Sequence, residues 1–248
     1  MQQTRLLMGM PITVEIVDGS ASNQDFDAMY DYFTYVDNTY STYKTDSEIM
    51  RINRGLPKSR WSKEMQAVLD LCEQTKQATD GYFDIAHNGQ LDPSGIVKGW
   101  AINNAAQLLK KRGFKNFYIE AGGDIQVNGK NSHGKPWSIG IRNPFNRAEI
   151  IKTITVGSEG VATSGTYIRG QHVYNPHRPQ QDIEDIVSLT VIGPDIYNAD
   201  RFATAAFAMG KHGISFIETL DGYEAYMVDA NHMATLTSGF ERYAVSQQ

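Results

Sequence analysis

Two residues four positions apart could together bind a cation. Asp200 and Thr204 stand in the segment 198–210, NADRFATAAFAMG. On a helix, residues i and i+4 lie on one face, so a carboxylate and a hydroxyl oxygen would converge there. Such oxygen ligands suit Mg²⁺, which usually takes one or two protein carboxylates together with phosphate and water. The alternative interpretation is an aspartate cap followed by a threonine in the core.

A lysine follows a turn in the segment 91–102, LDPSGIVKGWAI. Proline fixes φ, glycine permits positive φ, and aspartate and serine side chains can bond nearby amides, so the start of a helix is expected here. In one interpretation Lys98 only extends its ammonium group to solvent. In the other, Lys98 and the free N–H groups of the helix N-terminus face an anion. Asp92 would then bind a hydroxyl, an amide or a metal-bound water.

Three further segments are rich in glycine and polar residues: 80–86 (DGYFDIA), 120–127 (EAGGDIQV) and 161–176 (VATSGTYIRGQHVYNP). The glycine pair of the second segment indicates either a turn or bulge or a close approach of backbone to a ligand. His172 in the third is either a structural histidine or, beside phosphate chemistry, a base near neutral pH.

The elements that must position these segments alternate between helices and strands. Apolar spacing predicts helices that begin near 23–25, 62, 98 and 198–200, the first ending at 40, the third at 111 and the last at 209. Strands are predicted over 7–17, 137–142, 150–156, 160–163, 172–175, 187–192, 225–228 and 232–237, with a strand, turn and strand within 114–130. Adjacent strands without strict βαβ alternation predict an α+β fold with mostly antiparallel sheet.

The composition is that of a globular protein with a core. The chain has 248 residues, of which 41% are hydrophobic and 21% charged, close to the usual proportions. A net charge of −5, with no basic run longer than 110–112, argues against a nucleic-acid partner. The single cysteine, Cys72, excludes an intrachain disulfide and is expected to be a buried, inert thiol. One domain, 1–248, or two closely packed lobes would suit this length.

No targeting or membrane segment is predicted. No apolar run approaches the ~18 residues that a membrane helix needs. Residues 1–17 lack the apolar core of a signal peptide. We therefore expect a cytoplasmic protein, or a periplasmic one if a longer precursor is exported.

Taken in order, these segments resemble the ApbE family, the FAD:protein FMN transferases, formerly called thiamine biosynthesis lipoproteins. The motifs that carry the likeness are LMGMPITVEI (7–16), YSTYKTDSEIMRIN (40–53), DGYFDIA, DPSGIVKGWAI, AGGDI, ATSGTY followed by His172, and NADRFATAAFAMG. The resemblance spans almost the whole chain. It implies an α/β fold with T-fold-like lobes and a site between them. It also implies Mg²⁺-dependent transfer of FMN from FAD to a Thr or Ser hydroxyl of another flavoprotein, with release of AMP.

The resemblance assigns roles to residues of this sequence. It implies that Asp92 and Lys98 contact FAD. It implies that the Gly95 carbonyl, Asp200 and Thr204 bind Mg²⁺. His172 matches the suspected base and also lies in the FAD pocket. The other residues that match the pocket are Met8, Tyr43, Tyr82, Phe83, Asp84, Gly122, Gly123 and Asp124.

The sequence departs from the family pattern in three places. Met10 stands where the family has threonine. The segment 175–179 reads NPHRP in place of the usual continuation, which affects one pocket wall. Only residues 85–91 separate Asp84 from Asp92, where the family usually has a long stretch. This shortening could change lid closure or recognition of the acceptor.

Two alternative functions share the same motifs. Some family members mainly hydrolyse FAD to FMN and AMP, and a carrier that only binds FAD is a third function. Convergence of Asp200 and Thr204 on a cation favours an enzyme over a carrier. For the transferase, the expected acceptor is a flavoprotein such as a subunit of a membrane redox complex or a flavin-dependent reductase. No nucleic acid and no direct membrane span are expected.

Overall fold

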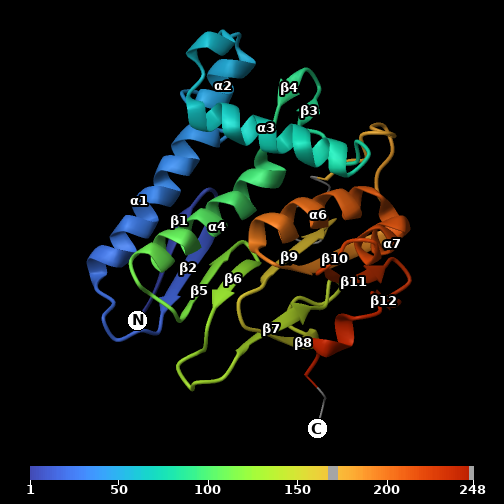
Figure 1. The fold of residues 1–248 in the computed structure, drawn as a ribbon. Helices are drawn as coiled ribbons and strands as arrows, with labels where there is room; N and C mark the ends of the chain where they lie inside the picture. Colours follow the sequence, from blue (N-terminus) through green and yellow to red (C-terminus); the bar gives the residue numbers. More distant parts are fainter. Residues whose placement is uncertain (167–172, 246–248) are drawn as a thin grey trace.

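An antiparallel sheet of eight strands forms the centre of the computed structural model, which describes residues 1–166 and 173–245 (Figure 1). Its order is β1-β2-β5-β6-β9-β10-β11-β12. The strands are β1 (Gln2–Leu7), β2 (Met10–Ile16), β5 (Phe117–Ala121), β6 (Asp124–Asn128), β9 (Gly160–Gly165), β10 (Ile186–Gly193), β11 (Glu224–Asp229) and β12 (Ala234–Leu236). Every neighbouring pair is antiparallel, which confirms the predicted fold class.

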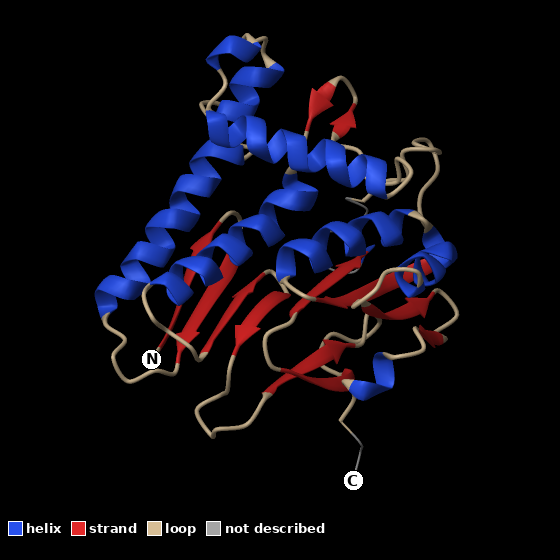
Figure 2. Ribbon diagram, in the orientation of Figure 1, coloured by secondary structure: helices blue, strands red, loops and turns tan. Residues whose placement is uncertain are grey.

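Helices cover one face of this sheet, and a hairpin covers the other (Figure 2). The helices are α1 (Asn23–Tyr40), α2 (Glu48–Asn53), α3 (Lys63–Ala78), α4 (Ser94–Lys111), α6 (Ile196–Ala208) and α7 (Gly213–Glu218). The hairpin consists of β7 (Trp137–Arg142) and β8 (Ile150–Val156). Within the described residues, none of the helices combines the length and apolar character needed to cross a membrane.

Alternation along the strands produces two hydrophobic cores. Successive side chains of a strand point to opposite faces. On β2, Ile12 and Val14 are fully buried against the helices, whereas on β6 Ile125 and Val127 pack against the β7–β8 hairpin. Burying an aliphatic side chain of this size stabilises the fold by about 1.5–3 kcal/mol. Cys72 is buried in the core beside the helices, as predicted.

Helices α4 and α6 cross closely because α4 has glycine at the crossing. A Cβ atom added to Gly99 would lie 2.6 Å from Asp200 Cβ and 2.8 Å from the Ile196 carbonyl oxygen. A Cβ atom on Gly95 would lie 3.3 Å from Thr204 Cγ2. The N-terminal half of α4 therefore lies directly against the face of α6 that carries Asp200 and Thr204.

The helices that carry Lys98 and Asp200 both begin earlier in the sequence than predicted. Helix α4 begins at Ser94, so Lys98 lies in its second turn. Helix α6 begins at Ile196 behind an Asp195 cap whose side chain accepts the Asn198 amide. Asp200 is therefore well inside the helix. The Asp195 cap starts α6 earlier than the apolar spacing alone indicated. The turn before Ser94 does the same for α4.

Two strand predictions also need correction. The strand predicted over 7–17 is confirmed for 10–16, which is β2, but Met8 and Gly9, with φ of 53° and 72°, form the turn that joins β2 to β1. The strand predicted over 172–175 is wrong for 173–175, which are not in a strand, while residue 172 lies outside the described residues.

We expect Gly99→Ala to lower the free energy of unfolding by about 1–3 kcal/mol, because the new methyl group overpacks the α4–α6 crossing. Urea unfolding of the two proteins measures the change. Gly157→Ala is the matched control, since a Cβ atom there has nothing within 4 Å. Equal stability of the Gly99 variant and the control would contradict the close crossing.

Candidate active site

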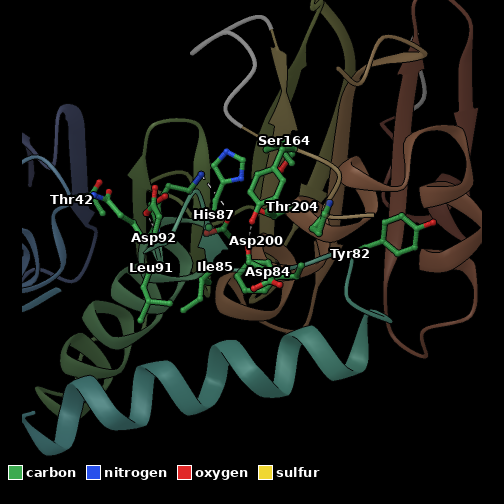
Figure 3. A pocket seen from close by; sticks show the side chains of 18 of the residues that line it. Thr42, Tyr82, Asp84, Ile85, His87, Leu91, Asp92, Ser164, Asp200 and Thr204 are labelled. Carbon is green, nitrogen blue, oxygen red and sulfur yellow. Dashed lines mark hydrogen bonds and ion pairs between the residues drawn. The ribbon is translucent and has the colours of Figure 1, made fainter. Parts of the chain in front are cut away.

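A cavity of about 510 Å³ opens where α4, α6, the end of β9 and the loop before α4 meet (Figure 3). Its volume falls in the usual range for small-molecule sites, about 300–1,000 Å³. Aromatic rings from distant parts of the chain line it, namely Tyr43, Tyr82, Phe83, His87 and Tyr174. Such rings supply flat apolar surface on which a planar ligand could stack. This is the first cavity.

A buried charge cluster lies at the inner end of the first cavity. Lys98 Nζ lies 2.6 Å from Asp124 Oδ2 and 3.6 Å from Asp200 Oδ1. Asp200 Oδ2 also accepts the Gly99 amide at 2.8 Å. Burial raises the pKa of the Asp200 carboxyl, Lys98 opposes that rise, and the neighbouring Asp124 carboxyl adds to it. The cluster therefore holds two carboxyl groups against one ammonium, an arrangement suited to a further cation.

The oxygen donors beside this cluster fit a magnesium ion. Asp200, Thr204 and Gly95 all line the first cavity. Gly95 lies one turn before Gly99 on α4 and packs directly against Thr204 of α6. The described residues contain no group of three His, Cys, Asp or Glu side chains that could hold a metal. One carboxylate, a hydroxyl and a carbonyl still form an all-oxygen set of the kind that Mg²⁺ completes with phosphate and water.

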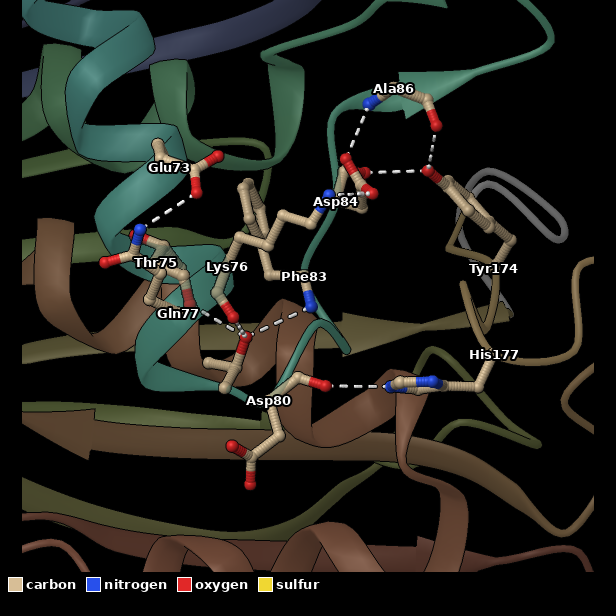
Figure 4. Close-up of polar contacts among 11 residues, drawn as sticks. Glu73, Thr75, Lys76, Gln77, Asp80, Phe83, Asp84, Ala86, Tyr174 and His177 are labelled. Atoms are coloured by element: carbon tan, nitrogen blue, oxygen red, sulfur yellow. Dashed lines mark hydrogen bonds and ion pairs between the residues drawn. The ribbon is translucent and has the colours of Figure 1, made fainter.

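The loop that carries Asp84 is fixed by polar contacts (Figure 4). Lys76 Nζ lies 2.7 Å from Asp84 Oδ2, and Asp84 Oδ1 accepts the Ala86 amide at 2.9 Å. The Tyr174 hydroxyl donates to the Asp84 carbonyl at 2.7 Å and contacts the Ala86 carbonyl at 3.3 Å. These bonds hold one wall of the first cavity in place.

The short stretch between Asp84 and Asp92 forms a tight hairpin. Strands β3 (Ala86–His87) and β4 (Gln90–Leu91) are joined by Asn88 and Gly89, with φ of 51° and 75°. Positive φ at both positions is typical of a type I′ turn. Asn53 anchors the hairpin, accepting the Leu91 amide at 2.8 Å and donating to the Leu91 carbonyl at 3.0 Å. A compact wall thus occupies the place of the longer family segment.

The unusual NPHRP segment forms another part of the wall. His177 Nε2 donates to the Asp80 carbonyl at 2.9 Å (Figure 4). Its ring packs edge-on against Tyr82 at 4.4 Å between centroids. His177 therefore packs behind Tyr82, which lines the first cavity, next to the loop that Tyr174 fixes.

The structure brings most of the predicted site residues together. The first cavity is lined by Tyr43, Tyr82, Phe83, Asp84, Asp92, Gly95, Lys98, Asp200 and Thr204. Asp92 accepts the Ser94 amide at 3.0 Å at the start of α4. Their roles toward a ligand stay predictions.

The remaining predicted residues lie elsewhere. Gly122 and Gly123 line a different cavity. Asp124 is fully buried behind Lys98, and its Oδ1 accepts the Thr163 amide at 3.1 Å. Met8 lies in the β1–β2 turn, outside the lining of the first cavity. The predicted base, His172, lies outside the described residues.

Sequence reasoning missed several lining residues. Thr163 and Ser164 stand within the ATSGTY motif, but neither was singled out. His87 and Tyr174 carry no local signal, because only the fold brings these two distant chain segments into contact. Their rings contact at 4.1 Å between centroids.

Comparison with known proteins gives one consistent result. The sequence model of the ApbE family matches residues 8–89 and 86–227. A Vibrio cholerae protein described as FAD:protein FMN transferase is 30% identical over 166 residues, 63% of this chain and 48% of that protein. An Escherichia coli (strain K12) protein with the same description is 23% identical, over 77% of this chain and 73% of that protein. The chain spans about half the length, or less, of the first curated relatives it matches.

Solved structures share the fold. The flavin transferase ApbE from Vibrio cholerae superposes with a TM-score of 0.87 at 21% identity and covers 98% of both chains. The ApbE protein of Thermotoga maritima gives the same score and identity over 99% of both chains.

We expect Tyr174→Phe to loosen the loop that carries Asp84. Losing a hydrogen bond costs about 0.5–1.5 kcal/mol net, so amide exchange over residues 84–91 should quicken about 2- to 10-fold. Hydrogen–deuterium exchange measures this. Tyr43→Phe is the control, since Tyr43 is 96% exposed. Unchanged exchange in the Tyr174 variant would mean that other contacts hold the wall.

Proposed function

This chain belongs to the ApbE family, and from that premise we propose that it transfers FMN from FAD to a threonine or serine hydroxyl of an acceptor flavoprotein. The observation that carries the proposal is the cluster of Lys98, Asp200 and Thr204 at the inner end of a cavity walled by aromatic rings. The charged inner end of such a site suits a pyrophosphate, and the aromatic side chains suit the flat ring systems of FAD. The curated relatives are described by the same activity.

The reaction exchanges a phosphoanhydride bond of FAD for a phosphoester bond to the acceptor. The acceptor hydroxyl oxygen attacks the phosphorus on the flavin side of the pyrophosphate, and a new P–O bond forms. The bond from that phosphorus to the oxygen bridging to AMP breaks, and AMP leaves with the electron pair. The hydroxyl proton passes to a base and then to solvent. Phosphoryl transfer of this kind depends mainly on positioning and on neutralising charge.

Lys98 supplies positive charge where the pyrophosphate would lie. Its side chain is 19% exposed and lines the cavity, while Asp124 holds its ammonium at 2.6 Å. The N-terminus of α4, at Ser94, adds the partial positive charge of the helix dipole. Asp92, which bonds the Ser94 amide, positions this helix end.

Gly95, Asp200 and Thr204 would hold the magnesium ion. When bound, Mg²⁺ would offset the negative charge of the pyrophosphate. The acidic cluster explains why such a cation is needed, since a phosphate entering alone would meet two carboxyl groups and one ammonium. We assign the role of base to His172 on the family resemblance, and that residue lies outside the described part of the chain.

The test incubates the protein with FAD and Mg²⁺, with and without a flavin-free acceptor flavoprotein. We expect AMP to appear and flavin to remain on the acceptor after denaturation. Chromatography for AMP and in-gel fluorescence for flavin measure both products. AMP with no flavin on the acceptor would indicate a hydrolase, and no AMP with FAD still bound would indicate a carrier. Chelating Mg²⁺ with EDTA should stop AMP release.

We expect Asp200→Asn to reduce AMP release by at least about 100-fold, because the amide cannot replace the charge that a metal site needs. Asp221→Asn, an exposed carboxylate outside the cavity, is the control. Circular dichroism verifies that both variants are folded. Release unchanged in the Asp200 variant would refute its assignment as a metal ligand.

A further inference from the structure

A second cavity, of about 810 Å³, lies on the face of the sheet opposite the helices. Its floor includes Val161 and Thr163 of β9 and Thr190 of β10, and the β7–β8 hairpin forms a wall. The turns at 9–11 and 122–123 form its rim. Neither Lys98 nor Asp200 lines it, so the cavity is distinct from the first.

The two cavities meet at Thr163, which lines both. Near Thr163 the ladder between β6 and β9 is short, since the two strands pair only at Ile125–Val161 and Gln126–Gly160. Beyond these pairs, the Thr163 amide bonds the Asp124 side chain in place of a strand partner. The other oxygen of Asp124 lies 2.6 Å from Lys98 Nζ. The Asp124 side chain therefore connects Thr163, which lines the second cavity, to Lys98 of the charge cluster.

The walls of the second cavity suit a peptide better than a flavin. Small residues such as Gly122, Gly123 and Ser138 alternate with aliphatic ones, and Tyr118 is the one aromatic residue among the described residues that line it, whereas several aromatic rings line the first cavity. Five consecutive residues of β7, 138–142, line the cavity. Because side chains alternate along a strand, this strand presents its edge to the cavity and not one face.

That edge of β7 has no strand partner among the described residues, since β7 pairs only with β8. An unpaired strand edge can bind an extended peptide through main-chain hydrogen bonds, which give affinity with little demand on sequence. Ile150 adds an apolar contact, as it is 46% exposed and lies over Gly140.

We propose that the second cavity and the β7 edge bind an extended segment of the acceptor protein, with its threonine or serine hydroxyl at Thr163. This inference rests on the proposed transfer of FMN. In-line displacement needs the attacking and leaving oxygens on opposite sides of the phosphorus. With FAD in the first cavity, the acceptor hydroxyl would approach the phosphorus from the second cavity, at Thr163, where the two cavities meet.

The test uses a synthetic library of extended peptides, each with one central threonine, together with FAD and Mg²⁺. Mass spectrometry identifies the peptides that gain FMN. For the best of them, Ile150→Glu should raise KM by at least about tenfold, because a charge replaces an apolar contact at the peptide site. The affinity for FAD, measured by flavin fluorescence, should stay the same. Met233→Glu, which alters another exposed apolar residue outside the cavity, should change neither value.

The outcomes separate this inference from the proposed function. Loss of FAD affinity in the Ile150 variant would make the second cavity part of the FAD site and overturn the inference. An unchanged KM would overturn it as well. Modification of an intact acceptor but of no peptide would show recognition of a folded surface in place of an extended segment. Failure of the wild-type protein to cleave FAD or transfer FMN under any condition would instead refute the proposed function.

Discussion

The close crossing of α4 and α6 at Gly99 is the contact on which the candidate site depends. Glycine removes the side chain that would separate the helices, so the Gly99 amide reaches the Asp200 carboxylate at 2.8 Å. One turn earlier on α4, Gly95 meets Thr204 in the same way. The crossing therefore places the backbone of Gly95 and Gly99 beside a carboxylate and a hydroxyl that lie about a hundred residues later in the sequence. A larger residue at either glycine would move the donors apart.

The same crossing places Lys98 between two buried carboxyl groups. Removing charges from water is costly unless they are paired and hydrogen-bonded. Asp124 is satisfied by Lys98 and by the Thr163 amide, so it ties α4 to strand β9. This one side chain links the helix that carries the lysine to the strand at which both cavities meet. The charge cluster is therefore bonded directly to strand β9 of the central sheet.

The outer wall of the first cavity is built differently, from short loops fixed by polar bonds. Tyr174 holds the Asp84 loop, His177 packs on Tyr82, and Asn53 anchors the β3–β4 hairpin. None of these contacts belongs to the main sheet. The compact β3–β4 hairpin with its Asn-Gly turn therefore forms part of the wall as a sheet of its own, without strand pairing to the main sheet among the described residues.

The sequence by itself predicted the candidate site residues and determined the fold class. Four-residue spacing placed Asp200 and Thr204 on one helix face, and the turn before Lys98 indicated that a helix follows it, although the predicted start at 98 was later than the observed start at Ser94. Alternating strands without βαβ units predicted the antiparallel sheet. Only the tertiary structure decided which of these residues meet. It separated Gly122 and Gly123 from the first cavity, buried Asp124 behind Lys98, and brought in His87 and Tyr174. The physical reason is that spacing along a chain fixes neighbours within one helix or strand, whereas contacts between elements depend on how closely their backbones can approach, as at Gly99.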